Sequence, residues 1–495
     1  MPTPRGRWLE LTCHHSRHLE VNLASSMRKA QTCENRRAIS DSGLTKAFFQ
    51  RAPGQQIRSQ ISKRRRCATT VSQAAPSVII SGGGAAGLTA AYFAALQGAQ
   101  VTVLERTREV GKKILISGGA RCNVLPMEVD VQRDFFTESS PSALRAVFAS
   151  WSLEDCKHWL EEEIGLKLAT EEENRKYFPA SNSSREVRDL LLGACMRLGV
   201  NIRCKTSMEG LSRLPDGGWR CTLADGAHQD ADSIVVATGG LSFPKMGTDG
   251  TGHRIIGALG HSMKPVYPAL TPLKGRHPAG SQLAGLSLYG VDLQCSAAAA
   301  AVKGNKKGQR AHRSAFLFTH RGYSGPSILD LSHSVTKALE RGTPLPRLTA
   351  NWLGDSRADW EARLAACPGA SSVPSFLRRH GVPQRLAEAL CGEVGVSERR
   401  IAELRRAERT ALLEKLTDYP LEYDGHEGYA KAEVTGGGVP LSEVHCASME
   451  SRLLPRVHLC GEILDVFGRI GGFNFYWAWL TGRLAGLHAA QTAPQ

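Results

Sequence analysis

The alternation of apolar and polar positions is most regular in residues 77–105. A β-branched run at 78–80 predicts a buried strand, the alanine-rich stretch at 85–97 predicts a helix that Gly98 ends, and 101–104 predict a second buried strand. A short run rich in glycine separates the first strand from the helix. This order of strand, tight turn, helix and strand is how nucleotide-binding domains begin.

The glycine turn matches G-x-G-x-x-G at Gly82, Gly84 and Gly87. In this motif the first glycine permits a tight turn, the second lets backbone amides approach a pyrophosphate, and the third lets the helix lie close to the strand. Ala85 and Ala86 open the helix, whose free N–H groups and partial positive charge attract the anion.

Glu105 ends the second strand, where an acidic side chain accepts hydrogen bonds from a ribose hydroxyl. An ordinary glycine turn needs no such surroundings, so the strand, the helix and the acid together favour a nucleotide site. The motif suits FAD and NAD alike. An acid at this position disfavours the 2′-phosphate of NADP.

Residues 106–230 carry patterns for both helices and strands. Residues 106–126 contain an apolar strand-like run and a glycine-rich loop, and amphipathic patterns predict helices at 152–164 and 184–198. A loop at 176–184 joins these helices. Residues 201–230 alternate between turn signals and predict a small β-meander.

Later segments again show the strand, glycine turn and helix that are typical of the nucleotide-binding domain begun at 77–105. Residues 233–240 predict a buried strand ending in a glycine turn, and a helix is predicted at 251–259. Short alternating strands begin near residue 268, and residues 352–417 are charge-rich with helical periodicity. The last sixty residues contain a strand, an acidic loop, a glycine turn and a helix beginning near Asn474.

These elements predict an α/β fold in which a β-rich insertion, carrying a small helical module, divides a nucleotide-binding domain. The predicted divisions are a leader (1–75), the first part of the nucleotide-binding domain (76–267), the β-rich insertion (268–351 and 419–434), the helical module (352–418) and the second part of the nucleotide-binding domain (435–495).

The net charge of +15 is uneven, because residues 1–76 hold 14 Lys and Arg against 4 Asp and Glu. This leader resembles an organellar transit peptide, and we expect chloroplast import, with the mitochondrion as the alternative. A disordered basic arm or a wrongly assigned start codon remains open. Since no aromatic residues interleave with the basic run at 63–66, the leader favours targeting over nucleic-acid binding.

The chain has 13 cysteines, ten of them beyond the leader. They form no C-x-x-C pair and no metal-ligand spacing with histidine, which favours a reducing compartment and no structural metal. No apolar run is long enough to span a bilayer, so we expect no membrane segment.

The segment GKKILISGGARCN at 111–123 closely resembles the signature of a family of bacterial and plastid NAD(P)/FAD-dependent oxidoreductases. The family includes aminoacetone-oxidase-like and bile-acid dehydro-steroid reductase-like flavoproteins, and five of its motifs occur in order between 77 and 488. The resemblance implies a glutathione-reductase-like FAD fold and a plastid-type member. Ala120 stands where the family usually has a third glycine.

In this loop the charges of Lys113 and Arg121 suit a dinucleotide phosphate, and the amides of Gly118 and Gly119 could form an anion nest. The thiol of Cys122 is a candidate catalytic group beside the flavin, although a lone cysteine in a tight loop is also a common packed residue.

Nearer the C-terminus the resemblance implies a second FAD motif. Glu462 or Asp465 would hold the ribityl hydroxyls, and the helix that follows would face the pyrimidine end of the flavin ring and stabilise negative charge there. The full set of expected cofactor-binding residues is Gly82, Gly84, Ala85, Ala86, Gly87, Glu105, Arg106, Lys113, Gly118, Gly119, Arg121, Asn123, Thr238, Gly239, Gly461, Glu462, Asp465, Gly471, Gly472, Phe473 and Asn474.

The segment FTHRGYSGPSIL beginning at Phe318 also resembles a family motif, which makes His320 and Tyr323 candidates for the substrate side. A simple turn at Gly322 and Gly325 is the alternative interpretation.

The sequence thus predicts an FAD-dependent oxidoreductase that uses NADH or NADPH to reduce a small molecule with a conjugated C=C or C=O bond. The electron donor is open because no second complete G-x-G-x-x-G is present. An amine oxidase, a flavoprotein acting in RNA modification and a non-catalytic flavin-binding protein are alternatives. The basic helix near residue 400 motivates the RNA alternative, but its interspersed glutamates favour a solvated face.

Overall fold

The computed structural model describes residues 75–172, 175–278, 280–296, 309–310 and 314–491. The predicted leader lies outside the described residues except for its last position. Ten cysteines fall within these ranges and all ten are free thiols. Within the same ranges no group of acidic, histidine and cysteine side chains is placed to hold a metal, and no helix is long and apolar enough to cross a membrane.

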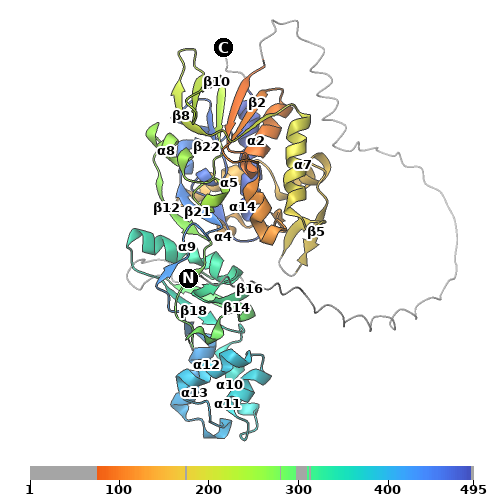
Figure 1. The fold of residues 1–495 in the computed structure, drawn as a ribbon. Coiled ribbons are helices and arrows are strands. Elements are labelled where there is room, and N and C mark those ends of the chain that lie inside the picture. Colours follow the sequence, from red (N-terminus) through yellow and green to blue (C-terminus); the bar gives the residue numbers. More distant parts are fainter. Residues whose placement is uncertain (1–74, 173–174, 279, 297–308, 311–313, 492–495) are drawn as a thin grey trace, which may run out of the picture. The chain divides into compact units, whose positions relative to one another are not determined.

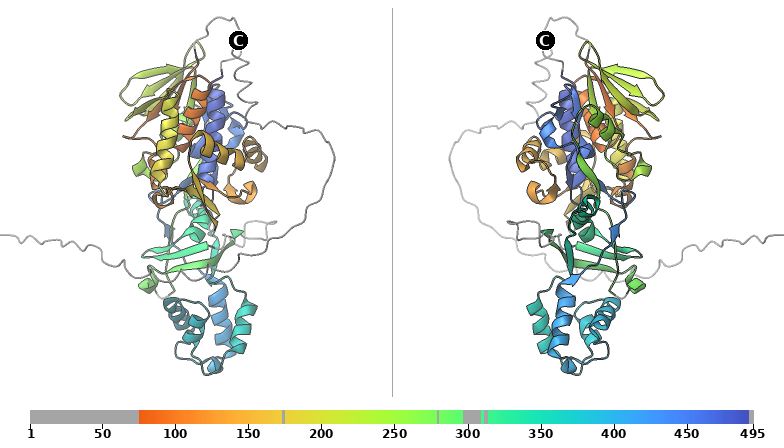
Figure 2. Two further views of the ribbon diagram at one scale, coloured as in Figure 1. Left: turned by 90° about the vertical axis from the view of Figure 1, so that its right-hand side faces the viewer. Right: turned by 90° about the vertical axis from the view of Figure 1, so that its left-hand side faces the viewer.

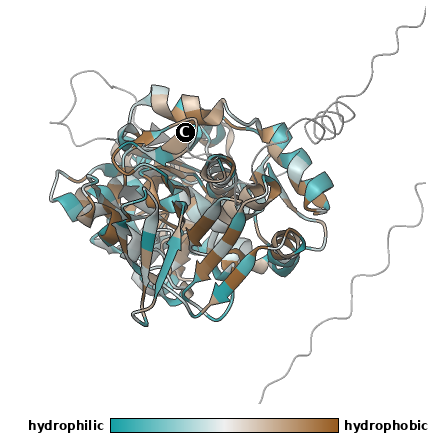
Figure 3. Cartoon of the chain, turned by 90° about the horizontal axis from the view of Figure 1, so that it is seen from above, coloured by the Kyte–Doolittle hydropathy of each residue, from teal (hydrophilic) through white to brown (hydrophobic). Residues whose placement is uncertain are grey.

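Among the described residues, seven strands form the central sheet in the order β22-β23-β24-β11-β1-β2-β7. β1 (Ser77–Ser81) lies between β2 (Gln100–Glu105) and β11 (Ser233–Val236) and is parallel to both. β24 (Val457–Leu459) lies parallel to β11, so early and late segments share one sheet, as predicted, and their carboxyl ends meet at one edge (Figure 1). The central strands carry short runs of buried apolar residues, such as 78–80 in β1 and 234–236 in β11, and strands with hydrophobic stretches are visible in Figure 3.

Two helices from opposite ends of the described chain pack against each other beside this sheet. α2 (Ala85–Leu96) follows the glycine turn, and α14 (Phe473–Ala489) is the last helix. A side chain at Gly486 of α14 would lie only 2.3 Å from the carbonyl oxygen of Ala90 in α2, so the helices touch backbone to backbone. This close contact fixes both helix N-termini near the carboxyl edge of the sheet.

Two predictions around the sheet were wrong. Residues predicted as strand-like form helix α3 (Lys112–Ile116), because Gly111 adopts φ +71° and starts a helical turn that Leu115 closes by donating its N–H to the Gly111 carbonyl at 3.2 Å. The predicted meander loses its first strand, since β7 (Asn201–Cys204) pairs with β2 in the central sheet.

The segment predicted as a loop at 176–184 is partly a strand. β6 (Lys176–Pro179) pairs with β5 (Leu168–Glu171), and only the residues after it form a turn. The helix predicted next is present as α7 (Ser184–Arg197), and it packs against α2 and α3. Other elements of this part are β3 (Leu125–Pro126), α4 (Val131–Asp134), β4 (Phe135–Phe136), α5 (Pro141–Phe148), α6 (Leu153–His158), β8 (Met208–Arg213), β9 (Trp219–Leu223), β10 (His228–Ala231), α8 (Thr251–Ala258), β22 (Val444–His445), β23 (Glu450–Ser451) and β25 (Phe467–Gly468).

The chain leaves and re-enters the nucleotide-binding part through two paired strands. β12 (Lys264–Ala269) runs outward and β21 (Val434–Gly438) returns antiparallel to it. α9 (Pro326–Arg341) packs on β12 and also on strands of the insertion, which ties the two parts together.

The insertion has its own sheet and hydrophobic core, with Trp352 and Trp360 among its fully buried residues. Its sheet follows the order β19-β18-β14-β16-β17-β13-β20, and helices α10 to α13 gather together next to it (Figure 2). The elements are β13 (Leu273–Lys274), β14 (Ser287–Ser296), β15 (Gln309–Arg310), β16 (Ser314–Thr319), β17 (Gly322–Ser324), β18 (Arg347–Asn351), α10 (Arg357–Ala366), α11 (Val373–Arg379), α12 (Gln384–Val394), α13 (Arg406–Thr417), β19 (Tyr419–Pro420) and β20 (Gly425–His426). Helices are thus present where the helical module is predicted; the domain boundaries themselves stay a prediction.

Candidate FAD and substrate site

A cavity of about 480 Å³ lies where the carboxyl ends of β1, β2, β11 and β24 converge. This is where open parallel sheets bind their ligands. Of the predicted cofactor-binding residues, those that line the cavity are Gly82, Gly84, Ala85, Ala86, Glu105, Arg106, Lys113, Gly118, Gly119, Asn123, Thr238, Gly239, Gly461, Glu462, Gly471, Gly472 and Asn474.

The three glycines of the turn have separate structural reasons. Gly82 adopts φ +105°, and a side chain there would lie 2.4 Å from the carbonyl oxygen of Ala237. A side chain at Gly87 would lie 1.8 Å from the Gly82 carbonyl oxygen, which is why the helix can approach the strand only with glycine. A side chain at Gly84 would meet nothing within 4 Å, so this residue faces open cavity. That arrangement leaves room for a pyrophosphate at the N-terminus of α2 and fits a dinucleotide.

Glu105 reaches the cavity from the end of β2. One carboxylate oxygen accepts a hydrogen bond from the Gly83 amide at 3.0 Å and the other accepts one from the Thr107 amide at 2.7 Å. These bonds fix the carboxylate beside the glycine turn. An ionised carboxylate has further lone pairs, which can accept hydrogen bonds from ribose hydroxyls.

Arg106 forms an ion pair with Asp249, a residue that the sequence did not single out. Its guanidinium pairs with Asp249 and donates a hydrogen bond to Thr251 Oγ1 at 2.9 Å. Partial burial would raise the pKa of Asp249, but the bonds from Arg106 and Thr251 outweigh burial and hold it at about 2. Arg106 therefore closes the cavity wall as part of an ion pair.

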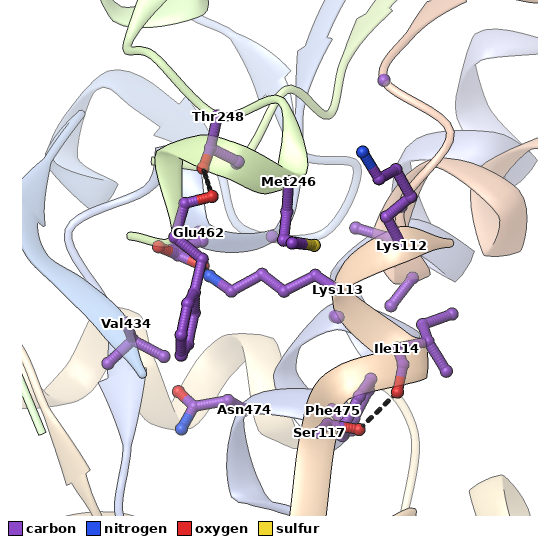
Figure 4. Close-up of a pocket in the computed structure, with 18 of the residues that line it drawn as sticks. Lys112, Lys113, Ile114, Ser117, Met246, Thr248, Val434, Glu462, Asn474 and Phe475 are labelled. Carbon is purple, nitrogen blue, oxygen red and sulfur yellow. Dashed lines mark hydrogen bonds and ion pairs between the residues drawn. The ribbon is translucent and has the colours of Figure 1, made fainter. Parts of the chain in front are cut away.

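Lys113 and Glu462 form an ion pair across the cavity. The Lys113 ammonium lies 2.6 Å from one Glu462 oxygen, and the Thr435 amide donates to the other at 3.0 Å (Figure 4). Both residues were predicted to bind cofactor separately, from loops far apart in sequence. Their pairing means that a ligand hydroxyl at Glu462 also meets the lysine.

The loop that carries the family signature is bent sharply. Gly118, Gly119, Ala120 and Cys122 all have positive φ, and only the first two have the freedom of glycine. Gly118 and Gly119 face the cavity. Ala120 stands where the family usually has glycine, and its positive φ strains the backbone because alanine carries a side chain.

Arg121 does not point into the cavity. Its guanidinium pairs with Glu171 at 2.8 Å, hydrogen-bonds Asn182, and lies 4.0 Å above the ring of Phe178. Arg121 therefore connects the signature loop to β5 through Glu171 and to β6 through Phe178. It does not line the cavity.

None of the three predicted catalytic residues lines the cavity. Cys122 is fully buried, and burial raises the pKa of its thiol to about 12, so the nucleophilic thiolate is disfavoured. Tyr323 is in the core of the insertion, where its hydroxyl donates to the Arg276 carbonyl. His320 lies on an exposed turn between β16 and β17. The turn lies at His320, whereas Gly322 and Tyr323 belong to β17, so the motif is a strand connection and its role on the substrate side stays a prediction.

Of the residues predicted from the second FAD motif, some line the cavity and others lie outside its lining. Glu462 lines the cavity, whereas Asp465 is buried beside it and accepts hydrogen bonds from the Glu138 amide at 2.8 Å and the Thr137 hydroxyl at 3.2 Å. Burial raises the pKa of Asp465 to about 6. Phe473 packs against Phe135 instead of facing the cavity.

The cavity extends beyond the nucleotide end to a distal end that the sequence did not reveal. Its walls there are apolar, and they also carry the two ionisable side chains that no sequence motif singled out. These residues, which we call the distal end, are Lys176, Leu270, Leu329, Glu433, Val434 and Ile470. Leu329 comes from the insertion, so both parts of the chain build this end.

The sheet, the glycine turn and the cavity define a dinucleotide-binding protein of the Rossmann class. Residues 76–488 match the family described as HI0933-like protein Rossmann domain, and the chain belongs to this family.

Three relatives cover most of the chain. It is 30% identical over 414 residues (81% of this chain, 94% of the relative) to the ribosomal RNA dihydrouridine synthase of Escherichia coli. It is 31% identical over 423 residues (83% and 98%) to the 3-dehydro-bile acid delta(4,6)-reductase of Clostridium scindens. It is 28% identical over 403 residues (81% and 95%) to the ribosomal RNA dihydrouridine synthase of Haemophilus influenzae. The chain is an FAD-dependent oxidoreductase.

Proposed function

We propose that this oxidoreductase uses NADH or NADPH to reduce a carbon–carbon double bond that is conjugated to a carbonyl group in a small molecule. The observation that carries the proposal is the distal end of the cavity. Leu270, Leu329 and Val434 offer an apolar wall to a hydrophobic substrate, while Lys176 and Glu433 offer polar groups to its carbonyl. Such a wall with few polar groups is typical of small-molecule sites.

Bound FAD, once reduced, supplies the hydride for this reaction. The protein supplies position and charge. Glu105 and the N-terminus of α2 would hold the nucleotide end of FAD, and the pair of Lys113 and Glu462 would offer partners to the ribityl hydroxyls. The N-terminal turn of α14, at Gly471 and Gly472, lines the cavity and would bring positive charge to the flavin end of the cofactor.

The names of the relatives support the same reaction. One is a reductase of a 3-dehydro bile acid with delta-4,6 unsaturation, in which a double bond lies next to a ketone. The others make dihydrouridine, which is uridine with hydrogen added across a double bond next to a carbonyl. Both products need one hydride and one proton.

The test separates the two halves of the reaction under anaerobic conditions. Purified residues 76–495 carrying FAD are mixed with NADH or NADPH, and the flavin absorbance is followed; then 2-cyclohexenone or a 3-keto-4-ene steroid is added. We expect bleaching by the nicotinamide, recovery of colour with the enone, and a product that has gained two hydrogen atoms. Recovery of colour with oxygen alone, together with bleaching by primary amines, would instead establish an amine oxidase.

A uridine in ribosomal RNA is the second candidate substrate. Two relatives carry this activity in their names, and Arg405, Arg406 and Arg409 at the start of α13 are exposed and form no ion pair with another described residue. A nearby acid, Glu408, is instead engaged by Arg399 at 3.4 Å.

Replacement of these three arginines by glutamine tests the RNA alternative. If RNA is the substrate, binding of ribosomal RNA weakens and its dependence on salt becomes shallower by about one unit of slope per lost phosphate contact. Dihydrouridine should then appear when unmodified ribosomal RNA is incubated with the native protein and NADPH. Equal RNA binding by native and triple-glutamine proteins would remove this candidate.

A further inference from the structure

Reduction of a conjugated double bond requires a proton donor as well as a hydride, and few side chains at the cavity can serve. Among the described residues that line it there is no histidine or tyrosine, and its one cysteine, Cys460, is fully buried with a raised pKa. Near the nucleotide end, Lys113 and Arg106 are engaged in ion pairs, and Lys112 donates a hydrogen bond to the Lys245 carbonyl oxygen at 3.4 Å. At the distal end the ionisable groups are Lys176 and Glu433.

Lys176 is aimed at the distal end by close packing. It begins β6, and its methylene groups run along Gly471: a side chain at that glycine would lie 2.8 Å from Cε and 3.4 Å from Cδ of the lysine. Gly471 at φ +123° leaves the space that the lysine stem occupies. The ammonium is thus delivered beside the N-terminal turn of α14, and within the described residues it forms no hydrogen bond or ion pair.

Glu433 reaches the same end from the start of the returning strand. Its amide donates to the Leu270 carbonyl at 3.1 Å, which fixes the backbone beside the apolar wall. Its side chain is exposed to the cavity, although protein surrounds it on most sides. It too forms no side-chain hydrogen bond or ion pair within the part of the chain that the structure describes.

The surroundings bring both groups toward proton exchange. Burial lowers the pKa of Lys176, an effect that Arg121 strengthens and that Asp330, Glu171 and Glu433 oppose. Burial raises the pKa of Glu433, against the attraction of Lys113 and Lys176. Asp330 is already neutralised by Arg469 at 2.9 Å, and Glu171 by Arg121 at 2.8 Å. An acid and a base that approach each other in pKa can pass a proton at neutral pH.

We propose that Lys176 donates the proton that completes reduction of the double bond and that Glu433 restores it from solvent. The inference rests on the proposed function. The two electrons and one hydrogen that NAD(P)H contributes would reach the carbon farther from the carbonyl through bound FAD, which returns to its oxidised form, and the Lys176 ammonium provides a proton to the carbon next to the carbonyl. The resulting neutral amine takes a proton from the Glu433 carboxyl, which takes one from water.

Three variants separate proton donation from charge. Lys176→Met keeps the stem that packs on Gly471, Lys176→Arg keeps a positive charge but holds its proton far too tightly to donate it, and Lys167→Met is a matched control at an exposed lysine just before β5. We expect the rate at which 2-cyclohexenone reoxidises the reduced flavin to fall about a hundredfold or more in both Lys176 variants. FAD content and the rate of reduction by NADPH should remain unchanged in all three.

Glu433→Gln tests the second step. The first reoxidation after mixing should be nearly as fast as in the native protein, whereas steady-state turnover should fall about tenfold because the lysine is reprotonated slowly. A native rate of reoxidation in Lys176→Met would overturn the assignment, and so would a full recovery in Lys176→Arg, because that result would mean that charge alone is needed.

A measurement independent of activity examines the lysine itself. Acetylation by acetic anhydride over a range of pH, quantified at each lysine by mass spectrometry, should show Lys176 reacting at lower pH than Lys167, and equal profiles would overturn the proposal. A native protein that no conjugated alkene reoxidises would refute the proposed function itself. A native protein that is reoxidised, with Lys176→Met equally fast, would refute only the role of Lys176.

Discussion

The contact between α2 and α14 makes Gly486→Ala a demanding test of the fold around the cofactor. The added methyl carbon would lie 2.3 Å from the Ala90 carbonyl oxygen and 2.9 Å from Ala90 Cα, whereas ordinary contacts begin near 3.4 Å. Both atoms belong to the backbone, so no side chain can move aside. The helices would have to separate by about 1 Å.

Overpacking of this kind costs about 1–3 kcal/mol, and alanine returns up to about 1 kcal/mol through its higher helix propensity. We therefore expect Gly486→Ala to be destabilised by about 1–2 kcal/mol. Because the N-terminus of α2 lines the cavity where the cofactor is proposed to bind, FAD affinity should fall as well.

A matched control is Gly257→Ala in α8. An added methyl there meets nothing within 4 Å, so only the helix propensity changes and stability should rise by up to about 1 kcal/mol. Thermal unfolding followed by circular dichroism, with FAD release followed by fluorescence, gives both quantities. If Gly486→Ala proves as stable as Gly257→Ala and keeps its FAD, the backbone contact between the two helices is wrong.

Other predictions address single residues. Gly84→Val fills open cavity, so the thermal stability of the FAD-free protein should change little, while FAD affinity, measured by titration, should fall about tenfold or more. Cys122→Ala should retain flavin reduction and reoxidation within about twofold, and slow alkylation of Cys122 at pH 8 should confirm that its thiol stays protonated. Because the pKa of Asp465 rises to about 6 on folding, its contribution to stability is present below about pH 4 and is lost as the pH rises through 6; Asp465→Asn should remove up to about 3 kcal/mol of this dependence in denaturant titrations. Residues 1–75 fused to a fluorescent protein should direct it to chloroplasts, and a cytosolic signal would contradict the targeting prediction.

Local chemistry explains what the sequence could predict. The spacing of Gly82, Gly84 and Gly87 requires only that neighbouring residues form a turn. The structure gives Gly82 the tight turn and Gly87 the close packing that the motif assigns, and it leaves open cavity at Gly84. Helix and strand periods likewise depend on short stretches, so α2, α7, α8 and α14 appear where they are predicted.

Long-range contacts explain what it could not predict. Lys113 meets Glu462 only because the two parts of the nucleotide-binding domain fold together, whereas Arg106 meets Asp249 because the first part brings the end of β2 next to the segment before α8. A single sequence carries no signal for such partners. Arg121 was misplaced because its charge suited a phosphate, whereas Glu171 and the ring of Phe178 hold it elsewhere.

The distal end escaped prediction for a related reason. Lys176 belongs to a segment that reads as a connector, and Glu433 precedes a short glycine-rich strand. Lys176 and Glu433 come together because β12 pairs with β21 and because the insertion packs against Ile470. The Ile470 amide donates a hydrogen bond to Asp330 of the insertion at 2.9 Å. The only sequence signal was that both are ionisable residues close to motifs of the family.

The most direct test of the account is an anaerobic titration of the FAD-loaded protein, first with NADPH and then with 2-cyclohexenone, followed at the visible flavin bands. The account predicts that NADPH bleaches the flavin, that one equivalent of enone restores the colour, and that saturated ketone is formed in equal amount. Flavin that is reduced by NADPH but reoxidised only by oxygen would contradict the proposed reaction, and protein that binds no FAD would contradict the site.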